Sequence, residues 1–149
     1  METGRNMKAI CKTKAEKGAT ICEIPIPVIG REEVLIKVKC AALCNSDVEV
    51  YHYTPLVEKA AYALPFVMGH EFSGEIIEVG EDVVGFQIGD HVAAETHIPC
   101  GYCETCRGGH QHICGNHMGV LGRTVDGCFA EYIKLHQKAL IKLPENTTY

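Results

Sequence analysis

The chain has 149 residues, of which 46% are hydrophobic and 22% are charged, so it is long enough for one globular domain with a real core. Its formal net charge of -5 and its lack of a basic run argue against nucleic acid and anionic membranes as partners. No apolar stretch approaches the roughly 18 residues of a membrane span, and residues 1–8 contain no signal-peptide core, which predicts a cytoplasmic protein.

Strand-forming residues dominate the chain. Runs of β-branched and aromatic residues, bounded by glycine and proline, predict strands at residues 7–11, 19–24, 34–43, 72–79, 91–94 and 129–135. Stretches with helical periodicity are short: residues 46–51, with Asn45 or Ser46 as the cap, and more weakly residues 57–62. The pattern predicts a mainly β fold with a few short helices.

A glycine-rich phosphate cradle is not visible in the sequence. The G-x-G-x-x-G motif that binds a dinucleotide follows a strand and opens a helix. Gly119, Gly122 and Gly127 do not have that spacing, and no βαβ pattern surrounds them. We therefore expect no cofactor-binding residues for a dinucleotide within this chain.

The chain is rich in cysteine. An odd number of cysteines, without an export signal, favours metal ligands and reduced core thiols over a disulfide framework. The nine are Cys11, Cys22, Cys40, Cys44, Cys100, Cys103, Cys106, Cys114 and Cys128.

Four of these cysteines follow the pattern C-x2-C-x2-C-x7-C, at Cys100, Cys103, Cys106 and Cys114. Four thiolates this close in sequence satisfy the closed tetrahedral coordination of a structural zinc. An iron–sulfur cluster is the rival interpretation, but its usual runs have a shorter third interval or a distant fourth cysteine. Four buried thiols without a ligand are the remaining alternative. Histidines flank the lobe, and we expect them to be solvated or to lie behind the ligands: His97, His110, His112 and His117.

A second set of metal-binding residue types is Cys44, His70 and Glu71. His70 and Glu71 belong to the pattern G-H-E-x2-G-x5-G-x2-V, and Cys44 opens the segment Cys-Asn-Ser-Asp. A thiolate, an imidazole and a carboxylate leave one coordination position open, as a catalytic zinc requires. Taken singly, these residues have simpler interpretations: a buried thiol, a surface His–Glu pair and, at Ser46 and Asp47, a helix cap.

Together, these patterns resemble the zinc-containing medium-chain alcohol and polyol dehydrogenases, most closely the threonine 3-dehydrogenase and sorbitol dehydrogenase branches. Residues 95–100, 106–109 and 127–132 carry much of the likeness, which covers nearly the whole chain from Met7. The resemblance implies a GroES-like, partly open barrel over residues 1–149 with a zinc lobe at residues 97–117. It also implies that a Rossmann cofactor domain and a C-terminal completion of the barrel lie outside these residues.

The resemblance implies a role for each residue of the second set. Cys44 and His70 would bind the catalytic zinc, and Glu71 would be a third or exchangeable ligand. Ser46 would take the proton from the alcohol that zinc polarises. Asp47 would hold the second nitrogen of His70.

One position departs from the family pattern. Relatives usually carry histidine where this chain has Glu49, three residues after Ser46 and so on the same helix face. A glutamate accepts a proton with a reference pKa of about 4.3, compared with about 6.5 for histidine. His52 is a possible substitute in the proton relay. The departure weakens the choice of threonine as substrate, whereas His97, in the context Glu-x-His-x2-Cys, favours it.

The implied activity is the reversible oxidation of a secondary alcohol, L-threonine or a polyol or diol, to a ketone with NAD. The resemblance also implies one structural and one catalytic zinc per chain, a small-molecule substrate, and a full-length enzyme that is a homo-oligomer. A zinc-binding GroES-like interaction module that has lost its cofactor domain is the main alternative. A co-chaperonin subunit is a more remote one, because it needs neither set of metal ligands. The identity of the alcohol and the choice between NAD and NADP stay open.

Overall fold

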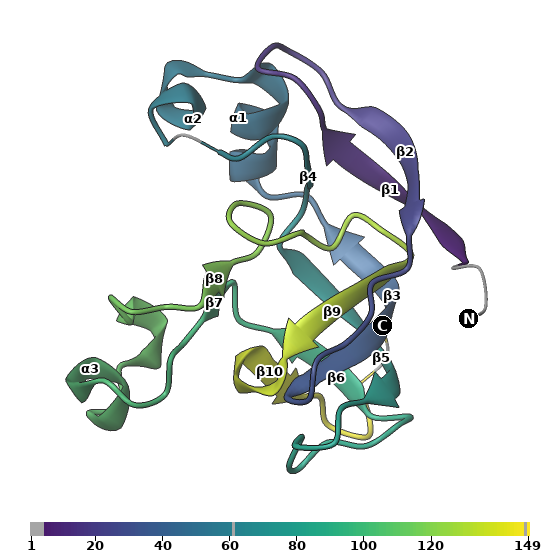
Figure 1. The fold of residues 1–149 in the computed structure, drawn as a ribbon, viewed down its shortest axis with the longest axis vertical. Helices are drawn as coiled ribbons and strands as arrows, with labels where there is room; N and C mark the ends of the chain where they lie inside the picture. The colour runs from purple at the N-terminus through teal and green to yellow at the C-terminus, as the bar shows by residue number, and fades with distance from the viewer. Residues whose placement is uncertain (1–4, 61, 148) are drawn as a thin grey trace.

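The computed structural model describes residues 5–60, 62–147 and 149, and its strands form a curled half-barrel (Figure 1). One sheet has the order β2-β1-β4, a second has the order β10-β6-β5-β3-β9, and a small third sheet pairs β7 with β8. The strands are β1 (Asn6–Lys12), β2 (Thr20–Pro25), β3 (Glu33–Ala42), β4 (Phe66–Val67), β5 (Glu71–Val79), β6 (His91–Ala94), β7 (His97–Ile98), β8 (Gly119–Val120), β9 (Tyr132–His136) and β10 (Leu140–Lys142). The helices are α1 (Asn45–His52), α2 (Pro55–Lys59) and α3 (Glu104–Arg107), with 3-10 turns η1 (Gln111–Ile113) and η2 (Gln137–Ala139).

The prediction of a mainly β fold is confirmed. Five of the six predicted strands lie within one or two residues of β1, β2, β3, β5 and β6. The main core lies on the five-stranded sheet, where Val34, Ile36, Ile76 and Val92 are fully buried. These β-branched residues fit a pleated surface that is covered by neighbouring side chains.

The predicted strand at residues 129–135 begins later than expected, at Tyr132. Phe129 instead belongs to a crossing segment: its N–H donates to the Met68 carbonyl at 2.9 Å, and its own carbonyl accepts from Ile10 at 2.7 Å. Two residues on, the Glu131 carbonyl accepts the N–H of Val38 in β3 at 3.0 Å, so the segment bridges the two larger sheets before β9 starts.

The helix predictions need two corrections. The first helix has Cys44 at its N-cap, not Asn45 or Ser46, because the Cys44 N–H is satisfied by the side chain of Asp47 at 2.9 Å. The second helix is α2, which starts and ends earlier than the predicted residues 57–62 because Pro55 opens its first turn. Residue 61, within that predicted range, lies outside the described residues. The short strands β4, β7, β8 and β10 were not predicted, since two or three residues carry too little pattern.

The pairing of β3 with β5 places the candidate metal ligands next to each other. The two strands are antiparallel, and their register sets Ala42 at the end of β3 opposite Glu71 at the start of β5. Cys44 follows β3 by two residues, and His70 precedes β5 by one. Two segments that are far apart in sequence therefore meet at one end of the sheet.

A close backbone contact that requires glycine fixes the segment just before His70. Residues 127–129 run against residues 67–69, and the Gly127 N–H donates to the Val67 carbonyl at 2.8 Å. A Cβ atom on Gly127 would lie 2.1 Å from the Gly69 carbonyl oxygen. Only glycine permits so close an approach of two backbones.

The cysteine-rich lobe projects from the barrel on a two-stranded stem, at the lower left of Figure 1. His97 pairs with Val120 and Ile98 pairs with Gly119 in this stem. Lys138 ties the lobe to the barrel, because its Nζ donates to the Cys100 carbonyl at 2.8 Å. None of the helices in the described residues has the length and apolar composition of a membrane span.

A buried lysine joins the first strand to the first helix. Lys12, at the end of β1, is 1% exposed. Its Nζ donates to the carbonyls of Gly18 at 2.9 Å and Tyr51 at 3.1 Å, and also to that of Glu16. Burial lowers the pKa of this amine. The three bonds hold the loop after β1 against the C-terminal end of α1.

We expect Lys12→Met to destabilise the fold by about 2–3 kcal/mol, because methionine keeps the apolar stem but leaves buried carbonyls without a donor. Urea unfolding would measure the change. Lys17→Met, at an exposed position of the same loop, is the matched control. Equal stability of the two variants would show that the Lys12 bonds contribute nothing.

Candidate metal centres and substrate cavity

The lobe brings its four cysteines to one point. Their Sγ atoms lie within 4.8 Å of one another, and Cys100, Cys106 and Cys114 are buried. The Sγ–Sγ distances are 3.9 Å for Cys100–Cys106, 3.8 Å for Cys103–Cys114 and 3.6 Å for Cys114–Cys100. All nine cysteines lie in the described part of the chain, and each is free.

These distances fit a tetrahedral metal. A zinc ion bonded to four sulfurs at about 2.3 Å separates the sulfurs by about 3.8 Å. A disulfide, by contrast, needs sulfurs about 2.0 Å apart. The donor set and its spacing therefore suit a closed structural zinc site.

Backbone N–H groups inside the lobe favour a thiolate at Cys100, whereas burial raises the pKa of the Cys106 thiol to about 12. Burial raises the pKa of the Cys100 thiol, but the N–H groups of Tyr102 and Cys103 lower it, and the resulting pKa is about 6. The Cys106 N–H also points at the Cys103 Sγ, at 3.4 Å. The turns between the cysteines therefore present donors to sulfurs that a metal would bind as thiolates.

The second ligand set also comes together. One donor atom each from Cys44, His70 and Glu71 lies within 4.8 Å of the others. Nε2 of His70 is 3.8 Å from Oε1 of Glu71 and 3.4 Å from Oγ of Ser46. The same imidazole nitrogen thus faces the carboxylate and the serine, and this arrangement suits a metal with an open position.

The Asp47 carboxylate contacts both Cys44 and His70. Its side chain is 5% exposed, and Oδ1 lies 3.5 Å from Nδ1 of His70. Its other oxygen, Oδ2, accepts the Cys44 N–H at 2.9 Å. Asp47 therefore holds the helix start and faces the side of the imidazole turned away from Ser46. The sequence-based prediction for Asp47 named only the imidazole contact.

Cys128 lies directly behind this set but has the character of a core thiol. It is fully buried, and its Sγ faces the Glu71 carbonyl at 3.6 Å. Burial raises the pKa of its thiol to about 12. A thiol that stays protonated at neutral pH packs the core and does not compete as a ligand.

The proposed proton relay is not assembled in the described residues. The Glu49 carboxylate accepts the Thr54 hydroxyl at 2.7 Å, near the C-terminal end of α1. His52 is exposed and packs edge-on against Tyr51, with ring centroids 5.4 Å apart. Among the described residues, neither side chain forms a hydrogen bond with Ser46, so their roles stay predictions.

The lobe histidines are exposed, as solvated residues would be. His97 and His117 meet edge to face, with ring centroids 5.8 Å apart, and His110 and His112 lie 6.2 Å apart in a similar way. His97 differs from the other three because it also lines a cavity next to His70.

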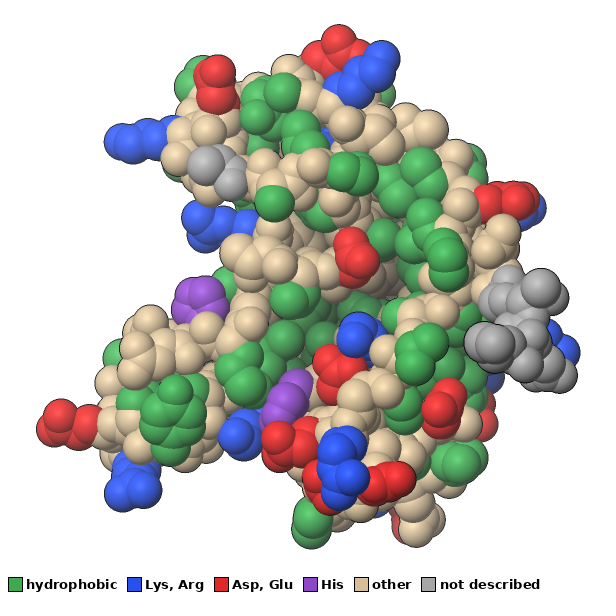
Figure 2. All heavy atoms as spheres, viewed as in Figure 1, with side chains coloured by type: hydrophobic (Ala, Val, Ile, Leu, Met, Phe, Trp, Pro, Cys, Tyr) green, Lys and Arg blue, Asp and Glu red, His purple; other side chains and the backbone are tan. Residues whose placement is uncertain are grey.

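This cavity has a volume of about 200 Å³. Figure 2 shows the surface indented at the left, between the α1–α2 unit and the lobe. The cavity is lined by three predicted site residues, Ser46, Asp47 and His70, and by three residues that were not predicted: Tyr62, Thr96 and Arg123. Those three come from separate loops, and no spacing in the sequence connects them to His70.

Comparison with known proteins identifies relatives over nearly the whole chain. Residues 30–145 match the family described as the alcohol dehydrogenase GroES-like domain. L-threonine 3-dehydrogenase from Escherichia coli K12 (DH10B) is 43% identical over 140 residues, which cover 94% of this chain and 40% of that enzyme. The predicted resemblance is thereby confirmed.

Solved structures agree with this result. Galactitol-1-phosphate dehydrogenase from E. coli superposes with a TM-score of 0.83 at 32% identity, covering 95% of this chain and 39% of that one. An alcohol dehydrogenase from E. coli CFT073, complexed with NADH, superposes with a TM-score of 0.80 at 36% identity, covering 97% and 40%. The chain thus spans about 40% of the length of its relatives.

The lobe geometry predicts the outcome of removing one sulfur. Cys103→Ser should remove about one zinc per chain and destabilise the lobe, because structural zinc binding is coupled to folding. Elemental analysis and thermal unfolding would measure both effects. Cys40→Ser, at an exposed cysteine on β3, should leave both unchanged. A Cys103→Ser protein with its full zinc content and an unchanged Tm would contradict a zinc site in the lobe.

Proposed function

Because the chain belongs to the family of alcohol dehydrogenase GroES-like domains, we propose that it is the catalytic domain of a zinc-dependent medium-chain dehydrogenase. The reaction is the oxidation of a small secondary alcohol to a ketone with NAD. The observation that carries the proposal is the open set Cys44, His70 and Glu71 beside a cavity that Ser46 lines. That cavity is smaller than the roughly 300–1,000 Å³ of sites for drug-sized ligands, which suits a small alcohol.

In this proposal, residues 1–149 form the catalytic domain, the zinc lobe spans residues 97–117, and a Rossmann domain outside these residues binds the cofactor. Two observations support it: the chain spans about 40% of its relatives, and one relative is complexed with NADH. The full-length enzyme would be a homo-oligomer. It would act in the cytoplasm, where the thiolates of both centres stay reduced.

Zinc held by Cys44, His70 and Glu71 would supply Lewis-acid polarisation of the alcohol. Ser46 would receive the alcohol proton, and two observations support this role: its hydroxyl lies 3.4 Å from Nε2 of His70, and it lines the cavity. Asp47 orients the imidazole from the other nitrogen, at 3.5 Å. Glu49 or His52 would carry the proton onward. For Glu49, this requires a side-chain movement that breaks its present bond to Thr54.

The same relatives support a proposal for the substrate class. L-threonine and galactitol 1-phosphate, named in two of them, are small hydroxylated molecules. We propose L-threonine, or a polyol or diol, as the substrate of this enzyme.

Replacing the proton acceptor tests the proposed reaction. In the full-length enzyme, Ser46→Ala should lower kcat for alcohol oxidation by about 100-fold or more, the usual effect of losing a group that transfers a proton. Zinc content should not change. Ser73→Ala, on β5 and outside the cavity lining, is the control. A Ser46→Ala enzyme with unchanged kcat would rule out the assigned role of Ser46.

The isolated chain should bind neither NAD nor NADH and should not oxidise alcohols. Hydride transfer requires a nicotinamide held close to the reacting carbon, and the sequence contains no strand–glycine loop–helix unit to hold its pyrophosphate. Calorimetric titration and an alcohol oxidation assay would measure both properties. Micromolar binding of NAD by these 149 residues would mean that they contain a cofactor site of another kind.

A further inference from the structure

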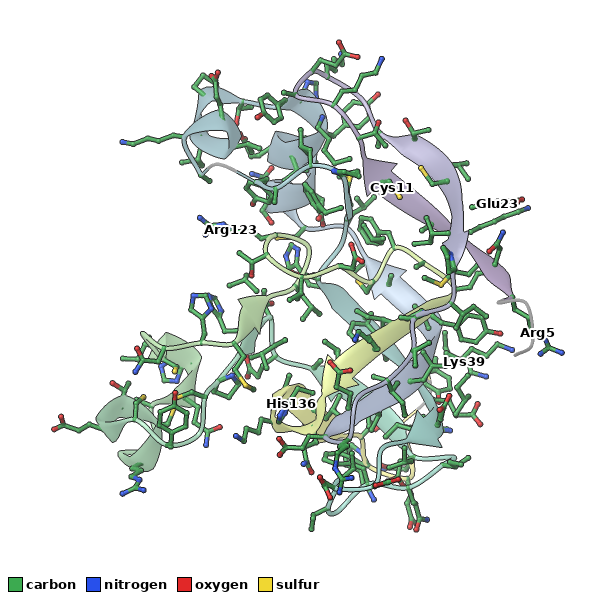
Figure 3. All side chains as sticks on the ribbon, in the orientation of Figure 1. Arg5, Cys11, Glu23, Lys39, Arg123 and His136 are labelled. Atoms are coloured by element: carbon green, nitrogen blue, oxygen red, sulfur yellow. The ribbon has the colours of Figure 1, made fainter. Side chains whose placement is uncertain are left out.

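A guanidinium group lies at the mouth of the cavity. Arg123 follows β8 and lines the cavity, and Figure 3 shows its side chain pointing outward from the loop at the left edge of the molecule. Its Nη2 donates a long hydrogen bond, 3.4 Å, to the Ala60 carbonyl. Its Cζ lies 5.6 Å from the centre of the Tyr62 ring, within the range of a cation–π contact. These contacts hold the side chain against the segment that follows α2.

The backbone that carries Arg123 is anchored beside His70. Gly122 has a φ of +64°, and a Cβ atom there would lie 2.7 Å from the Gly69 carbonyl oxygen. The turn is closed by a hydrogen bond from the Arg123 N–H to the Val120 carbonyl at 3.2 Å. The position of the guanidinium is therefore tied to the segment that presents His70.

Arg123 has unused hydrogen-bonding capacity. Among the residues that the structure describes, no carboxylate lies within 4.0 Å of its guanidinium. Arg31, by contrast, pairs with Glu81 at 2.8 Å and Asp82 at 2.7 Å. The acidic residue that lines the cavity, Asp47, is buried and already engaged by Cys44 and His70. A planar fork of donors without a partner matches a carboxylate or a phosphate.

We propose that Arg123 binds an anionic group on the substrate, while the hydroxyl that reacts lies at Cys44, His70 and Glu71. The inference rests on the proposed function and narrows its substrate to anionic secondary alcohols: hydroxy or amino acids with a carboxylate, or polyol phosphates. Arg123 is thus a specificity-determining residue. It acts on binding and orientation and takes no part in the transfer of the proton.

Kinetics of the full-length enzyme with three probes test the assignment. Arg123→Gln should raise KM about tenfold to a hundredfold for an anionic substrate, L-threonine or glycerol 3-phosphate, as expected for a lost hydrogen bond to a charged group. KM for uncharged 2,3-butanediol should not change. The anionic substrate whose KM rises more identifies the group that Arg123 binds, a carboxylate or a phosphate. Arg123→Lys should recover part of the loss, because it restores the charge but not the fork.

The control is Arg5→Gln, which removes the same charge at the opposite edge of the molecule (Figure 3). The inference would be overturned if Arg123→Gln changed KM equally for charged and uncharged alcohols while zinc content and Tm stayed unchanged. It would also be overturned if Arg5→Gln and Arg123→Gln raised KM for the anionic substrate equally.

A binding measurement separates this inference from the proposed function. Inorganic phosphate and acetate are titrated into the zinc-loaded protein while NMR follows the arginine Nε–H resonances. We expect a saturable shift of the Arg123 resonance with at least one of the two anions, absent in Arg123→Gln. If that shift occurs but no alcohol is oxidised, the dehydrogenase proposal fails and the anion site stands. If alcohols are oxidised but no shift occurs with either anion, the anion site fails alone.

Discussion

The antiparallel pairing of β3 with β5 is the constraint on which the site depends. Its register sets the end of one strand beside the start of the other, so that Cys44 and His70 leave the sheet at the same corner. The helix α1, which carries Ser46 and Asp47, starts directly from this corner. Because a shift of one residue would turn every side chain to the opposite face, the buried core of these strands also protects the geometry of the site.

Burying the Asp47 carboxylate next to His70 carries a desolvation cost that the fold offsets locally. The carboxylate lies in the first turn of α1, where the helix dipole favours negative charge, and it accepts the N–H of Cys44. Its second oxygen faces Nδ1 of the imidazole. One buried residue thus caps a helix and orients a candidate metal ligand, so the stability of α1 and the geometry of His70 are coupled.

The two candidate metal centres are built in different ways. The lobe takes its four sulfurs from one short segment, and its contacts with the barrel include the β7–β8 stem and the Lys138 bond to Cys100. The set Cys44, His70 and Glu71 requires long-range strand pairing before any ligand meets another. Binding of metal in the lobe is therefore a local folding event, whereas the second set can form only once the barrel has formed.

The sequence alone was sufficient to predict the mainly β fold and the four-cysteine cluster, because spacing and strand periodicity are local properties. The grouping of Cys44, His70 and Glu71 was predicted from their residue types and from the family resemblance, since no local pattern connects residues so far apart. The sequence also placed Ser46 and Asp47 at the start of a helix beside that set. The bond of Glu49 to Thr54, the isolation of His52 from Ser46 and the position of Arg123 were decided only in the tertiary structure. The position of Arg123 depends on a loop contact, Gly122 against Gly69, which leaves no periodic pattern in the chain. The bond of Glu49 to Thr54 is local, but it depends on the side-chain conformation at the end of α1, which the residue pattern does not specify.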